Sequence, residues 1–144
     1  MMILVQPLKG NYKLLYFDGK HVRGAGIIDI EDTERGFRPS NFRLRWGGRK
    51  QYRNTPTKDL VADLRDSEVA LVRHDEAFEG FLHDFQVPYS FQSLCRICLL
   101  DDRVTTLNSE EAVKYGKGEK ICLECAKREL RREAAHLEIG RAHV

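Results

Sequence analysis

Short apolar runs separated by turn residues dominate the start of the chain. MILV, YKLLYF, AGIIDI and FRLRW are rich in β-branched and aromatic residues, a composition that favours strands. Asp18-Gly19 and Gly47-Gly48 each follow one of these runs and are typical of tight turns. The intervening segment EDTERGFRPSN is polar and contains Gly and Pro, so it predicts a loop. We therefore expect residues 1–55 to form a small β-rich module.

The apolar positions of residues 56–92 change to helical spacing. Leu60, Val61 and Leu64 fall on one face of KDLVADLRD, and Asp59 lies in its first turn, which predicts a short amphipathic helix. SEVALVR favours a strand, although its apolar positions also fit a continuation of that helix. We interpret the whole segment as a connector made of helix and strand.

The end of this connector contains one more helical pattern. In DEAFEGFLHDF the apolar residues recur at helical spacing, which predicts a second amphipathic helix that ends at Pro88. VPYSFQSL then alternates aromatic and polar positions, which predicts an extended segment. The chain as a whole is expected to belong to the α+β class.

Composition limits the classes of protein to which the chain can belong. Its 144 residues suffice for one ordinary domain or two small ones, and a hydrophobic fraction of 42% permits a core. Charged residues make up 32% of the chain but nearly cancel to a net charge of +2. No apolar run approaches the roughly 20 residues of a membrane-spanning helix, and MMILVQPLKG lacks the features of a secretory signal. A cytoplasmic protein that binds no membrane is expected.

The four cysteines of the chain form two C-x-x-C pairs, Cys95 with Cys98 and Cys122 with Cys125, separated by 23 residues. In a reducing compartment, pairs at this spacing indicate a metal site rather than disulfides. Structural Zn²⁺ takes four ligands in a tetrahedron, and four thiolates leave no open position for water or substrate. The sequence therefore predicts one structural Zn²⁺ held by all four cysteines. A redox dithiol pair, an iron-sulfur cluster and buried free cysteines are the alternatives.

The segment around the cysteines predicts the architecture of this site. RVTTL and AVKY are β-prone, KYGKGEK is typical of a turn, and AKRELRREAAHL predicts a helix whose start orients the second pair. Residues 93–137 are thus expected to form a treble-clef-like or zinc-ribbon-like module. Arg96, Lys127 and Arg128 are expected to offset the negative charge of the thiolates.

A basic and aromatic stretch between Gly36 and Arg53 contains no acidic residue. Arginines beside exposed aromatic rings are typical of single-stranded nucleic acid binding, because phosphates take the charge and bases stack on the rings. The alternation is equally typical of a half-buried strand with a solvated arginine face. The candidate nucleic-acid-binding residues are Arg38, Arg43, Arg45, Trp46, Arg49, Lys50 and Arg53.

No motif of a catalytic site is present in the sequence. It contains no G-x-x-x-x-G-K-[ST] loop, and no Ser-His-Asp or Cys-His arrangement suggests itself. The five histidines show neither H-x₃-H nor H-E-x-x-H spacing. We expect a non-catalytic chain without a small-molecule substrate, whose partners are RNA, DNA or another protein.

CRICLLDDRVTTL, the turn-rich spacer and ICLECAKRELRRE together resemble the cysteine-containing N-terminal extension of archaeal superfamily 2 helicases of the DEAD/DEAH-box, Ski-type kind. The resemblance covers roughly residues 52–137, and NTPTKDLVADLRDSEVALV is similar to the helix that precedes the metal site of that extension. It implies an accessory domain ahead of two RecA-like ATPase domains, with the four cysteines as metal ligands. The alternative is a free-standing zinc-ribbon adaptor or transcription-type factor without ATPase activity.

The last seven residues, EIGRAHV at 138–144, match the translation of a common sequencing adapter, GAG ATC GGA AGA GCA CAC GTC. We expect these residues to be a non-native tail on a fragment of a longer protein. The underlying codons test this expectation, since a native tail would use a different nucleotide sequence.

Overall fold

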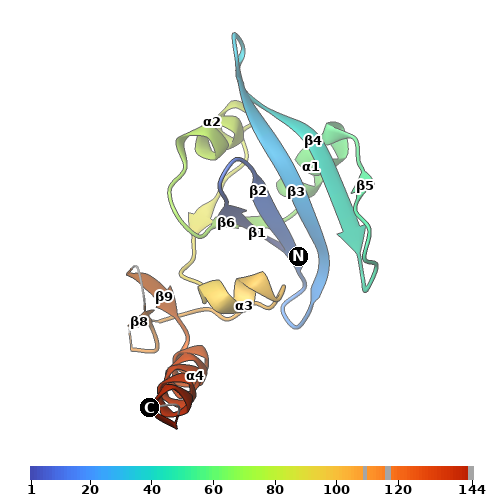
Figure 1. The fold of residues 1–144 in the computed structure, drawn as a ribbon. Coiled ribbons are helices and arrows are strands. Elements are labelled where there is room, and N and C mark those ends of the chain that lie inside the picture. The colour runs from blue at the N-terminus through green and yellow to red at the C-terminus, as the bar shows by residue number, and fades with distance from the viewer. Residues whose placement is uncertain (109, 116–117, 143–144) are drawn as a thin grey trace. The chain divides into compact units, whose positions relative to one another are not determined.

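The computed structural model describes residues 1–108, 110–115 and 118–142. The protein belongs to the α+β class, as predicted, with two sheets and four helices in the described residues (Figure 1). It divides into two compact units, Met1–Gln92 and Ser93–Val144. Residues 1–55 and 56–92, which the sequence analysis treats separately, lie together in the first unit.

The first unit is built on a seven-stranded sheet with the order β5-β4-β3-β2-β1-β6-β7. Strands β1 to β4 form an antiparallel meander, whereas β6 pairs with β1 in parallel and β7 pairs with β6 in parallel. The strands are β1 (Met2–Pro7), β2 (Tyr12–Phe17), β3 (Val22–Thr33), β4 (Gly36–Trp46), β5 (Arg53–Asn54), β6 (Glu68–Leu71) and β7 (Ser90–Phe91).

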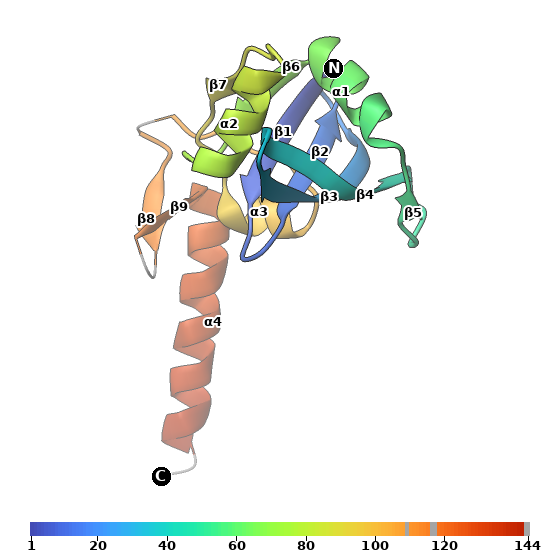
Figure 2. The ribbon, with the colours of Figure 1, turned by 90° about the horizontal axis from the view of Figure 1, so that it is seen from above.

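Two helices, α1 (Thr57–Arg65) and α2 (Glu76–Asp84), lie on the same side of this sheet, as Figure 2 shows. Leu60 and Leu64 of α1 and Phe78 and Phe81 of α2 are completely buried in one cluster with strand residues such as Tyr16. Helical spacing in the sequence therefore predicted the faces that build the core. Both helices, the four strands of the meander and the strand in SEVALVR are confirmed.

The prediction of a loop for EDTERGFRPSN is wrong, because most of this segment belongs to β3 and β4. Cross-strand pairs continue to Thr33 and Gly36, and only residues 34–35 form the turn. The hydroxyl of Thr33 donates to the carbonyl of Gly36 at 2.7 Å, which closes the hairpin. Pro39 pairs with Ile30 of β3, but β5 pairs only with Arg43 and Leu44, so no described strand on the β5 side of Pro39 needs a backbone donor from it.

Helix α2 begins as the sequence predicts but ends before Pro88. The Asp75 side chain accepts a 2.9 Å hydrogen bond from the backbone N–H of Phe78, which caps the helix start. At the other end Gln86 adopts a left-handed conformation with φ of 57°, and the N–H of Val87 donates to the carbonyl of Leu82 at 2.9 Å. This backbone reversal, rather than the proline, ends the helix.

The second unit contains α3 (Arg96–Leu100), the hairpin β8 (Val113–Tyr115) and β9 (Glu119–Ile121), and α4 (Leu123–Ala142). The predicted turn between these two strands has Gly116 and Lys117 at its centre, which lie outside the described residues. Of the suspected tail, residues 138–142 belong to α4 and residues 143–144 lie outside the described residues. Among the described helices, none combines the length and apolar character that a membrane crossing requires.

RVTTL does not form the predicted strand. Thr106 makes a single isolated bridge with Leu94, and the backbone of the remaining segment hydrogen-bonds around the first cysteine pair. The N–H of Arg103 donates to the carbonyl of Cys98 at 2.9 Å, and the N–H of Cys95 donates to the carbonyl of Thr105 at 3.0 Å. The β-propensity of the segment is therefore overridden by its wrapping around Cys95 and Cys98.

Candidate metal centre

The first cysteine pair is positioned by α3, a short helix that the sequence analysis did not predict. Cys95 is the residue before the first turn, and its Sγ accepts a 3.4 Å hydrogen bond from the backbone N–H of Cys98. Both cysteines are buried, with exposed fractions of 0% and 3%. The C-x-x-C spacing thus places the two sulfurs on the inner side of one tight helical turn.

The second pair lies where β9 ends and α4 begins. Cys122 directly follows the hairpin, and Cys125 lies in the first turn of α4. The N–H of Ala126 donates to the carbonyl of Cys122 at 3.0 Å, so the helical hydrogen bonding starts at this cysteine. The sequence prediction that a helix start orients the second pair is confirmed.

The four sulfur atoms converge on one point. All four Sγ atoms lie within 4.8 Å of one another. The Sγ of Cys98 is 4.0 Å from that of Cys122 and 3.7 Å from that of Cys125. These separations are much longer than the roughly 2.05 Å of a disulfide bond, and all four cysteines are free. The cluster can hold a metal ion.

The surroundings of the cluster shift the pKa values of the individual thiols in different directions. Burial raises the pKa of the Cys95 thiol, but hydrogen bonds from the backbone N–H groups of Cys122 and Cys98 outweigh it and lower the pKa to about 7. Burial raises the pKa values of Cys98 and Cys125 above the usual range. Without a cation, four thiolates so close together, three of them buried, would repel one another, and a bound metal removes this repulsion by replacing their protons.

Two neighbours of the cluster were missed by the sequence analysis. The hydroxyl of Thr105 donates to the Sγ of Cys98 at 3.3 Å. The negative charge of Cys98 raises the pKa of the Arg103 guanidinium, which also pairs with Asp101 at 3.1 Å. Both residues reach the cluster because the chain folds back after α3, a path that residue spacing does not reveal.

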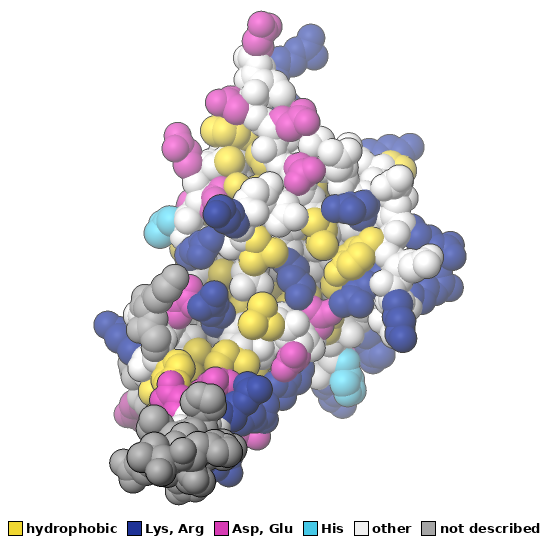
Figure 3. Space-filling view, in the orientation of Figure 1, with side chains coloured by type: hydrophobic (Ala, Val, Ile, Leu, Met, Phe, Trp, Pro, Cys, Tyr) yellow, Lys and Arg dark blue, Asp and Glu magenta, His cyan; other side chains and the backbone are white. Residues whose placement is uncertain are grey.

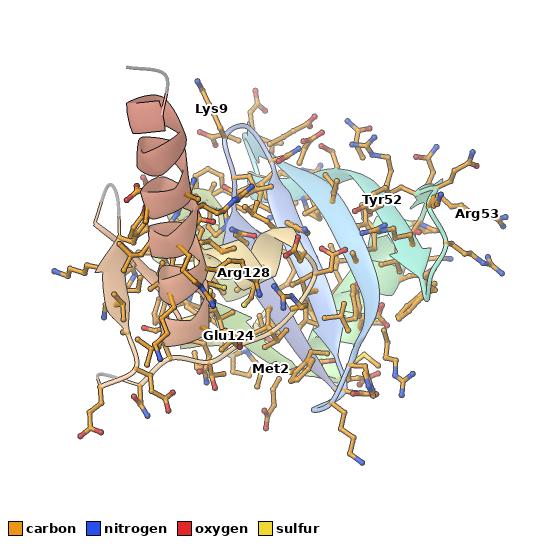
Figure 4. All side chains as sticks on the ribbon, turned by 60° about the horizontal axis from the view of Figure 1, so that its bottom comes forward. Met2, Lys9, Tyr52, Arg53, Glu124 and Arg128 are labelled. Atoms are coloured by element: carbon orange, nitrogen blue, oxygen red, sulfur yellow. The ribbon has the colours of Figure 1, made fainter. Side chains whose placement is uncertain are left out.

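The cations predicted to offset the thiolate charge have other partners or are exposed. Arg96 forms an ion pair with Glu119 of β9, and Arg128 pairs with Glu124 at 3.9 Å along α4 (Figure 4). Lys127 is exposed on the same helix. The Arg96 pair joins α3, which contains Cys98, to β9, which ends directly before Cys122. Arg103, by contrast, is a described cation whose charge does interact with a cluster sulfur.

We expect Thr105→Val to weaken metal binding by about tenfold, because the sulfur of Cys98 loses a hydrogen bond that supports its charged form. A chelator competition titration measures this change. Thr106→Val is the matched control, since Thr106 is exposed and its hydroxyl has no hydrogen bond to the cluster among the described contacts. Equal metal affinity of both variants would show that the hydrogen bond to Cys98 contributes nothing.

The candidate nucleic-acid-binding residues do not all lie together. Arg38 pairs with Asp84 of α2 at 3.0 Å and lies 5.1 Å over the Phe85 ring, so it ties β4 to that helix. Trp46 packs against Tyr16, with ring centroids 5.1 Å apart. The remaining residues gather around the end of β4, the following loop and β5; they are Arg43, Arg45, Arg49, Lys50 and Arg53.

Comparisons with known proteins do not extend this description. No protein-family model matches the sequence, no curated protein matches it, and no solved structure matches the fold.

Proposed function

We propose that Cys95, Cys98, Cys122 and Cys125 hold one structural Zn²⁺ that joins the two halves of the second unit. The observation that carries the proposal is the convergence of four sulfurs within 4.8 Å. Ligands at about 2.3 Å in a tetrahedron lie about 3.8 Å apart, and the two Sγ separations from Cys98 are 3.7 and 4.0 Å. Zn²⁺ fits because four thiolates in a tetrahedral set are typical of structural zinc sites.

The order of elements supports a treble-clef-like type for this site. The hairpin of β8 and β9 leads directly into α4, whose first turn carries Cys125. A zinc ribbon does not require a helix at its second ligand pair, whereas the second pair here depends on one. The positive end of the α4 dipole also favours thiolate at this position.

The chain in this proposal is a non-catalytic accessory fragment of an ATP-dependent superfamily 2 helicase. Support comes from the resemblance around the four cysteines and α4. Such a fragment aids the binding of nucleic acid or of a partner protein, and the zinc ion has a structural role because four cysteines leave no open coordination position. The free-standing zinc-ribbon adaptor remains the second candidate.

X-ray absorption at the zinc edge tests the metal part of the proposal. Four sulfur neighbours at about 2.3 Å and no nitrogen or oxygen neighbour are expected. A mixed sulfur and nitrogen shell would contradict the ligand set.

The reading frame downstream of residue 137 tests the helicase part separately. A P-loop followed by a D-E-x-H box in that frame supports the helicase. A stop codon soon after residue 137 would contradict it and favour the adaptor.

A further inference from the structure

Positive charge is concentrated in one continuous segment of the first unit. Residues 36–58 contain seven lysines and arginines and no acidic residue, so that a chain of net charge +2 carries 2 − 7 = −5 elsewhere. Figure 3 shows dark-blue side chains gathered along the side of the first unit that carries β4 and β5. This separation of charge makes one edge of the sheet attractive to polyanions although the chain as a whole is almost neutral.

The strand register places these cations on both faces of the sheet edge. Arg43 pairs with Asn54, and Arg53 pairs with Leu44, whose side chain is buried on the face covered by the helices. Because neighbouring positions of a strand point to opposite faces, Arg43 and Arg53 flank the edge from its two sides. Arg49 and Lys50 are exposed in the loop between the strands. No described carboxylate forms an ion pair with any of these four cations.

An aromatic ring lies among these cations. The guanidinium of Arg45 lies 5.0 Å over the ring of Tyr52, and both side chains are partly exposed. Figure 4 shows Tyr52 and Arg53 at the β5 edge of the sheet. A guanidinium already stacked on a ring presents a flat surface of the kind on which an unpaired base stacks.

We propose that this β4–β5 basic surface, made of Arg43, Arg45, Arg49, Lys50, Tyr52 and Arg53, binds single-stranded nucleic acid. The cations contact phosphates, and Tyr52 stacks with a base. This assignment rests on the proposed function of an accessory module and names the ligand class and the surface. It excludes Arg38 and Trp46, because the first is held by Asp84 and the second packs against Tyr16.

The composition of the surface favours single-stranded nucleic acid over other partners. Stacking on Tyr52 requires a base that is free of its neighbours, which a duplex does not present. A protein interface needs an apolar centre, yet among the described large hydrophobic residues that are exposed, Trp46 alone falls within residues 36–58.

Fluorescence anisotropy tests the proposal. It measures the affinity of the zinc-loaded 144-residue chain for a labelled oligothymidylate or oligouridylate of about 15 nucleotides. The affinity is expected to fall with salt, with a slope of about −0.7 per phosphate contact. Arg43→Ala/Arg53→Ala weakens binding at least tenfold and reduces that slope by about 1.4. Tyr52→Ala weakens binding by about tenfold and leaves the slope unchanged.

Lys9→Ala/Lys20→Ala is the matched control, because it removes two exposed cations from turns outside the surface. Its affinity stays within twofold of the unaltered chain. The proposal is overturned if the double arginine variant binds like this control, or if a duplex of equal length binds more tightly. Equal competition by polyglutamate also overturns it and indicates an acidic protein partner.

The zinc content of the same samples separates this proposal from the previous one. If zinc-loaded protein does not bind the oligonucleotides, the proposal for the β4–β5 basic surface is overturned and the metal site is not. Protein that binds them through Arg43 and Arg53 but contains no zinc supports the surface and contradicts the metal site.

Discussion

Cys98→Ser abolishes stoichiometric zinc binding and unfolds the second unit, while the first unit keeps its structure. Metal affinity at such sites is largely folding free energy, on the order of 10 kcal/mol. The buried cluster of the second unit consists of three cysteines with Ile121 and Ala126. Such a small core does not fold without a bound metal or another cross-link. Limited proteolysis with mass spectrometry measures the effect, and new cleavage sites are expected after residue 93.

Chelation of the unaltered protein provides the matched comparison for this prediction. EDTA should produce the same cleavage pattern as Cys98→Ser, and it should change nothing further in the variant. The hypothesis that zinc keeps the second unit folded fails if the zinc-free protein resists protease between residues 93 and 142 as well as the zinc-loaded protein does.

Phe81→Ala is expected to lower the free energy of unfolding of the first unit by about 3–5 kcal/mol. The zinc content of the protein should not change, because all four cysteines lie in the second unit. The Phe81 side chain is completely buried, and its ring lies 5.6 Å from that of Phe78 and 5.0 Å from that of Phe85. Removing it leaves a cavity between α2 and the sheet. Urea denaturation followed by circular dichroism measures the change.

Phe91→Ala is the matched control, since it makes the same chemical change at a ring that is 45% exposed. The ring of Phe91 buries less apolar surface than that of Phe81, so removing it should lower the free energy of unfolding by less than about 1.5 kcal/mol. If both variants lose equal stability, the core assigned to α1, α2 and the sheet is incorrect.

The strands and helices of the first unit were predictable where one face of the element is buried. FRLRW illustrates this, because Phe42 and Leu44 are buried while Arg43 is exposed. The segment EDTERGFRPSN was misinterpreted because Glu31, Asp32 and Thr33 are exposed although they belong to a strand. Where a hairpin extends beyond the core, backbone pairing holds it together and the polar pattern resembles that of a loop.

The candidate metal ligands were predictable because C-x-x-C spacing is a local property of the chain. Thr105 and Arg103 were not, because they reach Cys98 only through the backbone path that replaces the predicted strand in RVTTL. Arg38 shows the same limit, since its partner Asp84 lies 46 residues away and the ion pair depends on how α2 packs. Contacts between distant segments require the fold itself.

The metal content of the purified protein tests the central claim most directly. Elemental analysis combined with native mass spectrometry should find one zinc ion per chain, lost together with the structure of the second unit when the four cysteines are alkylated. Protein that is folded in both units but contains no stoichiometric metal would contradict the account.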